Sequence, residues 1–94
     1  MIVRFTPRAR RDLEMILSYV AERSPQGAAH VAASVEATME FIANHPHGSP
    51  RTSIPSLHVR IIAGFPYKVF YRLRRDAIEI IHIRHAARRP WLRS

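Results

Sequence analysis

The sequence contains no cysteine. Disulfide bonds and zinc–thiolate sites are therefore excluded, and a reducing compartment is compatible with the composition. Long apolar runs are missing as well, because no uncharged apolar stretch approaches the roughly 18 residues that a membrane span requires. The first residues carry Arg4, Pro7 and Arg8, where a secretory signal would need an apolar stretch. These absences predict a cytoplasmic protein without a membrane segment.

Acidic residues and lysine are scarce. Seven Asp plus Glu stand against fifteen Lys plus Arg, which leaves a formal net charge of +8. Lys68 is the only lysine, so the other fourteen basic residues are arginines. Arginine presents a planar fork that pairs with carboxylates and phosphates, so the composition favours a nucleic acid or an acidic protein segment as partner. A solvated arginine-rich surface without a partner is the alternative.

The chain is short but rich in apolar residues. Its 94 residues are 47% hydrophobic, which excludes general disorder. A chain of this length has room for one core, so residues 1–94 are predicted to form a single domain.

Two helices are predicted in the first half. Thr6 and Ser24 are each followed by a proline, the pattern of an N-cap with proline at the first helical position. Apolar residues then recur at helical spacing as far as residue 23 in the first segment and residue 44 in the second. The link between them is short, so the pair should form an antiparallel hairpin.

Strands are predicted at residues 2–5, 57–61, 67–73 and 77–84, since their apolar residues alternate or run continuously between turn residues. The last of these reads as a central strand that is buried on both faces. This order predicts an α+β fold: an N-terminal strand, a helical hairpin, and a three-stranded antiparallel meander with the helices on one sheet face.

Three segments follow one another along the chain: FTPRARRDL at residues 5–13, PYKVFYRL at 66–73 and IIHIRHAARRP at 80–90. Between them lie Tyr19, Pro46, Gly48 and Arg60. In this order and spacing the sequence resembles the ParE branch of the RelE/ParE superfamily of type II toxins. The resemblance implies a bacterial toxin that a ParD-like antitoxin, encoded beside it, holds inactive in a hetero-oligomer.

The superfamily implies two different activities. RelE-like members cut messenger RNA on the ribosome, whereas ParE-like members are associated with poisoning DNA gyrase. RNA cleavage needs a base, an acid and cations around the phosphorane. The candidates for such a ribonuclease site are Arg60, Arg72, His85 and Arg88. The RelE-like pattern usually places a tyrosine near the carboxy terminus, but this chain has none beyond Tyr71. Gyrase inhibition by binding is therefore favoured, with a ribosome-dependent mRNA endoribonuclease as the alternative.

The predicted target-binding residues combine sheet positions with the carboxy-terminal tail. They are Arg60, Arg72, His85, Arg88, Arg89, Trp91 and Arg93. Arg60 and Arg72 lie on strands that a hairpin makes neighbours, which predicts one basic patch; ion pairs with Glu14, Asp12 or Glu79 are the alternative. Trp91 either folds back into the core or stays exposed as an interface anchor between two arginines.

The antitoxin is predicted to lie along the helical hairpin and the exposed face of the sheet, with Arg8, Arg11 and Met15 of the first helix as its contacts. A methionine beside two arginines suits an acidic, amphipathic segment. No recognition helix for DNA stands out, so no sequence-specific DNA binding by this chain alone is expected.

Neither a metal nor a cofactor is predicted. His82 and His85 lie three residues apart on a strand, so their side chains should point to opposite faces. His45 and His47 lack a third ligand. Asp12 is predicted to be a structural partner of an arginine rather than a catalytic base.

Overall fold

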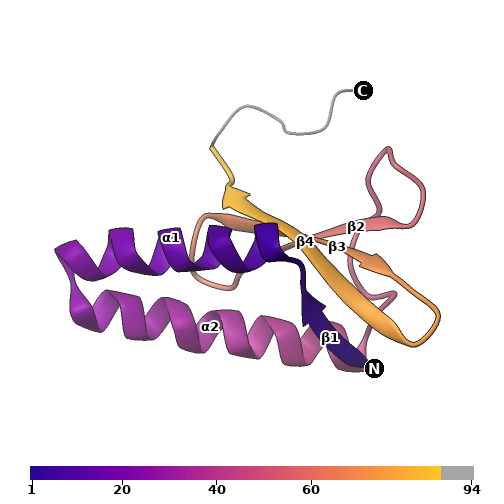
Figure 1. Cartoon of the computed structure of the whole chain (residues 1–94), viewed down its shortest axis with the longest axis horizontal. Coiled ribbons are helices and arrows are strands. Elements are labelled where there is room, and N and C mark those ends of the chain that lie inside the picture. The colour runs from indigo at the N-terminus through magenta and orange to yellow at the C-terminus, as the bar shows by residue number, and fades with distance from the viewer. Residues whose placement is uncertain (88–94) are drawn as a thin grey trace.

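The structure is a computed structural model and describes residues 1–87 of the chain. In order along the chain, the elements are β1 (Ile2–Phe5), α1 (Pro7–Arg23), α2 (Pro25–Asn44), β2 (Leu57–Ile61), β3 (Tyr67–Leu73) and β4 (Ala77–His85). Figure 1 shows the two helices side by side and antiparallel, with the sheet packed against them. The predicted α+β fold and its element order are therefore confirmed.

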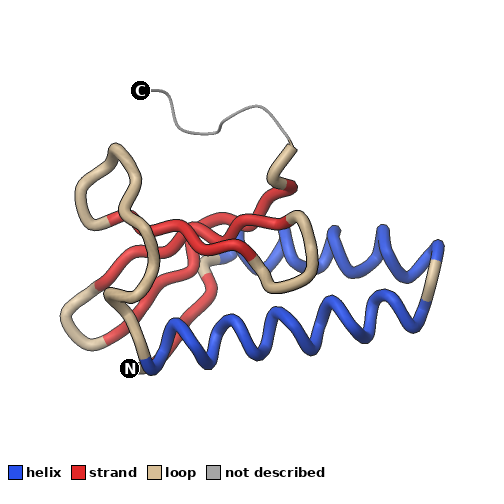
Figure 2. Tube along the Cα trace, turned by 180° about the vertical axis from the view of Figure 1, so that it is seen from behind, coloured by secondary structure: helices blue, strands red, loops and turns tan. Residues whose placement is uncertain are grey.

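Local capping determines where both helices begin. The Thr6 hydroxyl accepts a hydrogen bond from the Ala9 N–H at 3.2 Å, and the Ser24 hydroxyl accepts one from the Gly27 N–H at 2.9 Å. A proline follows each cap, as predicted. Because Ser24 ends α1 and caps α2, the chain reverses within a single residue (Figure 2).

The sheet has the strand order β1-β4-β3-β2. Strand β1 pairs in parallel with β4, while β4 with β3 and β3 with β2 form the predicted antiparallel meander. The β2–β3 turn places Gly64 at a φ of 81°, a left-handed conformation that favours glycine. Strand β4 is central, and Ile78, Ile80 and Ile83 are at most 2% exposed.

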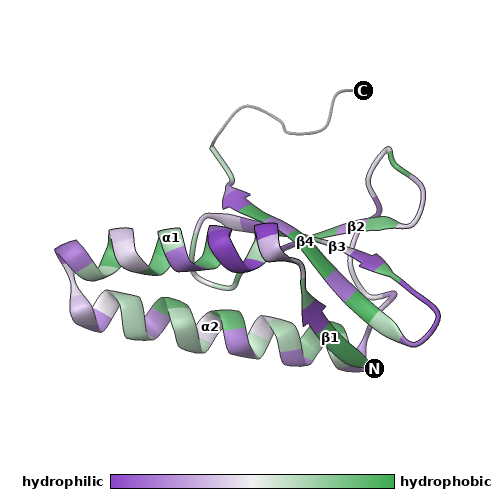
Figure 3. Ribbon diagram, viewed as in Figure 1, coloured by the Kyte–Doolittle hydropathy of each residue, from purple (hydrophilic) through white to green (hydrophobic). Residues whose placement is uncertain are grey.

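A β-bulge interrupts the pairing of β3 with β4. Phe70 pairs with His82 and Tyr71 with Ile80, so the register skips Ile81. The bulge explains why the buried isoleucines of β4 are spaced two residues apart before it and three after it. It keeps Ile83 in the same core as Ile80, between the sheet and the helical hairpin. In Figure 3 β4 crosses the middle of the molecule with green stretches separated by purple ones, whereas the β3–β4 turn is purple.

Apolar and polar residues alternate along β2 as predicted, but the polar side chains of His58 and Arg60 point toward the interior. His58 pairs with Tyr71 and Arg60 with Val69, and both partners belong to the core. His58 is only 3% exposed, whereas Ile61 on the alternate face is 55% exposed. The polar side of β2 therefore faces α2 and the loop that follows it.

The polar side chains on this side of β2 have hydrogen-bond and ring-stacking partners. The His58 ring stacks on Tyr71 with centroids 5.2 Å apart, and its Nδ1 lies 3.0 Å from the Ser49 carbonyl oxygen. The Tyr71 hydroxyl donates to the Pro46 carbonyl at 2.9 Å, and the Arg60 guanidinium lies 3.6 Å from the Phe41 ring centroid. We call these interacting residues the loop cluster: Phe41, Pro46, Ser49, His58, Arg60 and Tyr71. It fastens the loop at residues 45–56 to the sheet.

No helix within residues 1–87 combines the length and the apolar character that crossing a membrane requires.

Candidate functional site

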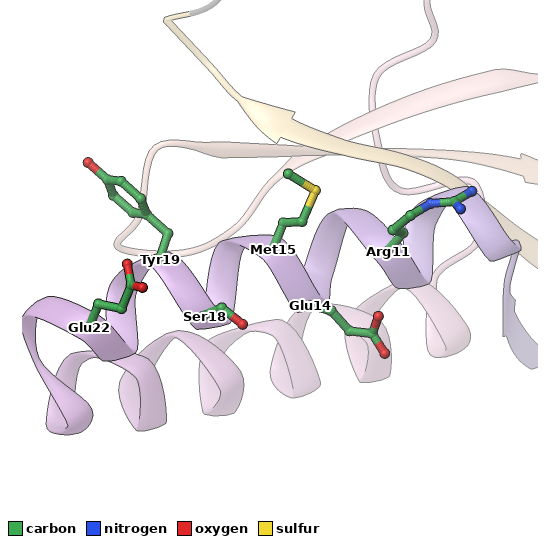
Figure 4. A pocket seen from close by; sticks show the side chains of 6 residues that line it. All are labelled: Arg11, Glu14, Met15, Ser18, Tyr19 and Glu22. Atoms are coloured by element: carbon green, nitrogen blue, oxygen red, sulfur yellow. The ribbon is translucent and has the colours of Figure 1, made fainter.

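Helix α1 presents two large side chains to solvent. Met15 is 67% exposed and Tyr19 is 56% exposed, and they lie one turn apart on the same helical face. Arg23 orders Tyr19, because its guanidinium lies 3.7 Å from the ring centroid and donates to the Tyr19 carbonyl at 2.9 Å. We call Met15 and Tyr19 the α1 ridge (Figure 4). Large side chains held in place but left exposed are typical of a docking surface.

A groove of about 560 Å³ lies between the α1 ridge and the end of β4, and we call it the α1–β4 groove. It is lined by Asp12, Met15, Ile16, Tyr19, Tyr67, Ile83, Arg84, His85 and Ala87. Most of these side chains are apolar or aromatic, and the basic ones come from β4. A surface of this kind can hold an amphipathic protein segment whose polar groups meet the basic ones.

Asp12 closes one side of this groove. Strand β1 pairs with β4 only as far as Ile80, so within residues 1–87 the next stretch of this β4 edge has no strand partner. The Asp12 carboxylate takes that place, because Oδ2 accepts from the Ile83 N–H at 3.0 Å and from His82 Nδ1 at 2.8 Å. The prediction that Asp12 pairs with an arginine is wrong, since the bulge brings His82 and a β4 amide to it instead.

The His82 ring is nearly buried, at 7% exposure. Burial lowers the pKa of His82, and this effect outweighs the hydrogen bond to Asp12, which raises it; the positive charge of Arg8 adds to the lowering. At neutral pH the ring is therefore uncharged, and its proton lies on Nδ1, where it can be donated to Asp12. This arrangement fastens α1 to β4.

His85 lines the groove and has a defined tautomer. Its Nδ1 accepts from the Ala87 N–H at 3.0 Å, and its ring meets that of Tyr67 edge-on with centroids 5.5 Å apart. Since Nδ1 accepts, the neutral ring carries its proton on Nε2. His85 is thus arranged as a hydrogen-bond donor, whereas a general base would need a free ring nitrogen. His82 pairs with Phe70 and His85 with Tyr67, so the two histidines alternate across the strand as predicted.

The predicted basic patch of Arg60 and Arg72 does not form. Arg60 pairs with Val69, which lies three residues before Arg72 on β3. Residues an odd number of positions apart along a strand point to opposite faces, so the two arginine side chains lie on opposite faces of the sheet. Arg60 belongs to the loop cluster, where its Nη1 lies 3.4 Å from the Ser49 hydroxyl. Adjacency of two strands in sequence did not reveal this register.

Arg72 takes part in the predicted alternative, an ion pair with Glu79. Its Nη2 lies 3.5 Å from Glu79 Oε1, and Arg74 Nε lies 3.0 Å from the same oxygen. The hydrogen bond from Arg74 lowers the pKa of Glu79, and the charges of both arginines act in the same direction against the effect of burial. Arg72 is therefore part of a structural ion-pair network.

Sequence reasoning missed several residues at the end of the sheet. Tyr67 and Ile83 line the groove. Their sequence patterns predict strand positions for both, but not that these positions lie beside α1. Lys68 on β3 pairs directly with Arg84 on β4, next to the pair of Tyr67 and His85. Two cations therefore lie side by side at this end of the sheet. Only the register of the strands reveals that pair.

The predicted antitoxin-binding residues are exposed on α1. Met15 forms the ridge, and Arg8 and Arg11 precede it on the exposed side. Arg88, Arg89, Trp91 and Arg93 lie outside the described residues, so their predicted role in target binding stays a prediction. Within residues 1–87 no three His, Cys, Asp or Glu side chains gather in a way that could hold a metal ion.

Comparison with known sequences gives one consistent family. Residues 3–90 match the profile of a family described as the ParE toxin of the type II toxin-antitoxin system parDE. The chain is 33% identical over 84 residues to Y4kP of Sinorhizobium fredii, which is named as a toxin; the match covers 89% of this chain and 86% of that protein.

Two proteins of Caulobacter vibrioides are also similar. Toxin ParE1 is 36% identical, with 87% of this chain and 85% of that protein covered. Toxin RelE2 is 30% identical, with 89% and 93% covered. Among solved structures, a chain of a chromosomal ParDE TA system from P. aeruginosa shares the fold, with a TM-score of 0.76 at 20% identity over 90% of this chain and 95% of that one.

Proposed function

The chain belongs to the ParE toxin family of type II toxin-antitoxin systems, and from that premise we propose that it inhibits DNA gyrase by binding rather than by catalysis. In this proposal it acts in the cytoplasm without a cofactor. A ParD-like antitoxin neutralises it by occupying the α1 ridge and the α1–β4 groove.

The state of the candidate catalytic residues carries the choice of binding over cleavage. Arg60 is engaged by Phe41 and Ser49, and Arg72 by Glu79 on the other sheet face. His85 uses Nδ1 to accept a backbone hydrogen bond, which leaves it a donor. These three described candidates can hold an anionic surface, but none of them is positioned to take a proton from a 2′-hydroxyl.

The decisive experiment measures both activities in one culture. The chain is induced without its antitoxin, and plasmid supercoiling and messenger RNA 5′ ends are followed from the same samples. We expect loss of negative supercoiling with unchanged mRNA ends, and inhibition of purified gyrase by the purified chain. New mRNA ends that appear before any change in supercoiling would contradict the proposal.

That experiment uses one variant in the tail and one control variant in the loop at residues 45–56. Trp91→Ala should abolish growth inhibition while Arg51→Ala, at an exposed loop position, should preserve it. Antitoxin binding should be the same for both variants. If Trp91→Ala also lowers the melting temperature by several degrees, the residue serves the core and the target contact must be sought elsewhere.

A second function, ribosome-dependent mRNA cleavage, has two observations in its favour. Lys68 and Arg84 lie opposite each other on the sheet, and two such cations could stabilise a phosphorane. The likeness to toxin RelE2 agrees with it. Under this alternative, Lys68→Ala would remove the new mRNA ends, whereas it would leave gyrase inhibition by a binding toxin largely intact.

The antitoxin contact can be tested separately. Met15→Ala removes the centre of the α1 ridge and should weaken antitoxin binding at least tenfold, because exposed anchors dominate such interfaces. Gyrase inhibition should be retained. Equal antitoxin binding by Met15→Ala and wild type would place the antitoxin on another surface.

A further inference from the structure

Two acidic side chains border the α1 ridge. Glu14 and Glu22 are exposed, and with Ser18 between them they form a row of successive turns beside Met15 and Tyr19 (Figure 4). A shallow hollow of about 330 Å³ lies along this row. We call Glu14 and Glu22 the acidic margin. It is unusual in this chain, which has only seven acidic residues against fifteen basic ones.

The surroundings of the ridge also carry cations. Arg84 lines the α1–β4 groove together with Asp12, whose carboxylate is bound by His82 and the Ile83 amide. Arg11 lies one turn before Met15 and lines the hollow beside the acidic margin. The ridge is therefore surrounded by charges of both signs. A partner that covers Met15 and Tyr19 must meet both signs, because the acidic margin and the groove flank the same two side chains.

The charges of the acidic margin are weakly compensated within the described residues. Glu14 has no ion-pair partner among residues 1–87. Glu22 lies 3.8 Å from Arg23, whose guanidinium is already committed to the Tyr19 ring. A partner that buries this margin under an acidic segment would set like charges together, which costs binding free energy.

We propose that the antitoxin segment docking on the α1 ridge carries charges of both signs: acidic side chains toward Arg11 and the groove, and at least one basic side chain toward the acidic margin. This inference rests on the proposed function and makes it more specific. Glu14 and Glu22 are about 12 Å apart along the helix axis, so the basic side chain must fall within that span. The margin then selects against antitoxins whose segment is uniformly acidic.

The test uses the protein encoded by the adjoining gene as the probe and measures its Kd for the chain by calorimetry at physiological ionic strength. The test variant carries Glu14→Lys and Glu22→Lys. The control carries Glu36→Lys and Glu40→Lys, two exposed positions on α2. Each variant has two Glu→Lys changes, so the net charge of both rises by the same four units and long-range attraction changes equally.

We expect the test variant to bind about tenfold more weakly than the control, with Glu14→Gln plus Glu22→Gln shifted in the same direction by less. Tighter binding than the control would mean a uniformly acidic segment and would overturn the proposal. Equal binding would place the margin outside the interface and overturn it as well. Absence of binding by the wild-type chain would instead contradict the antitoxin partner itself. Thermal melting of each variant verifies that it is folded.

Discussion

Two arginine–aromatic pairs in this molecule have nearly the same geometry but different surroundings. The Arg60 guanidinium lies 3.6 Å from the Phe41 ring centroid, and that of Arg23 lies 3.7 Å from Tyr19. The first pair joins β2 to α2 within the loop cluster, whereas the second lies within one exposed helix. The difference indicates that the loop cluster serves the fold, whereas the exposure of the α1 ridge supports the proposal that it binds a partner.

The tyrosines of the two regions should show the largest contrast. Tyr71 is fully buried, so Tyr71→Ala should lower the free energy of unfolding by about 3–5 kcal/mol. Tyr19→Ala should change it by less than about 0.5 kcal/mol, because that ring is 56% exposed. Urea unfolding of the two variants measures both values. Similar losses would remove the distinction between the regions.

The arginines test the same comparison at a smaller scale. Arg60→Ala removes the contact with Phe41 and the Ser49 hydrogen bond, and should cost about 1–2 kcal/mol of unfolding free energy. Arg23→Ala should cost about 0.5 kcal/mol or less while weakening antitoxin binding, since Tyr19 loses its support. A stability loss for Arg23→Ala equal to that of Arg60→Ala would contradict this division.

The pH dependence of stability tests the fastening of α1 to β4. The pKa of His82 is lowered in the folded state, so the unfolded chain binds this proton more readily. The contribution of the uncharged His82 ring to the free energy of unfolding is therefore fully present above the ordinary histidine pKa. It is lost as the pH falls toward the lowered pKa of the folded state. His82→Gln should therefore reduce the loss of unfolding free energy that wild type shows below about pH 6.5. An unchanged slope would mean that other groups cause it.

The ion pairs of Glu79 should have the smallest effect. Glu79→Gln breaks the contacts with Arg72 and Arg74, but these side chains are partly exposed and screened by salt, so the expected cost is below about 1 kcal/mol. Because the pKa of Glu79 is lowered, this contribution is present above the ordinary carboxyl pKa and disappears as the pH falls through the lowered one. Unfolding at two salt concentrations and at acidic pH measures it.

The candidate site was only partly visible before the fold was known. Met15, which follows Arg8 and Arg11 on the same helical face, indicated the exposed face of α1, and the structure bears out its exposure. The groove beside it depends on Tyr67, Ile83 and His85, which are far from α1 in sequence. The sequence singled out His85 as a candidate, but no local pattern records how β4 lies along α1, so the groove that they form could not be predicted.

Local interactions determined much of the architecture from the sequence alone. A cap side chain binds an amide three residues ahead and proline restricts the next φ, so Thr6 and Ser24 marked both helix starts correctly. Apolar periodicity separated helices from strands for a similar reason, since it reflects which face of each element is buried. These rules operate within a few residues and do not depend on the rest of the fold.

Only the tertiary structure decided which strand residues face each other. The register sets Arg60 and Arg72 on opposite faces, and the bulge at Ile81 brings His82 and the Ile83 amide to Asp12, about seventy positions earlier in the chain. A shift of one residue in a strand exchanges its two faces, so register depends on the packing of the whole sheet against the helices. That packing is a property of the assembled core, which is why neither the ion pairs nor the groove could be read from sequence spacing.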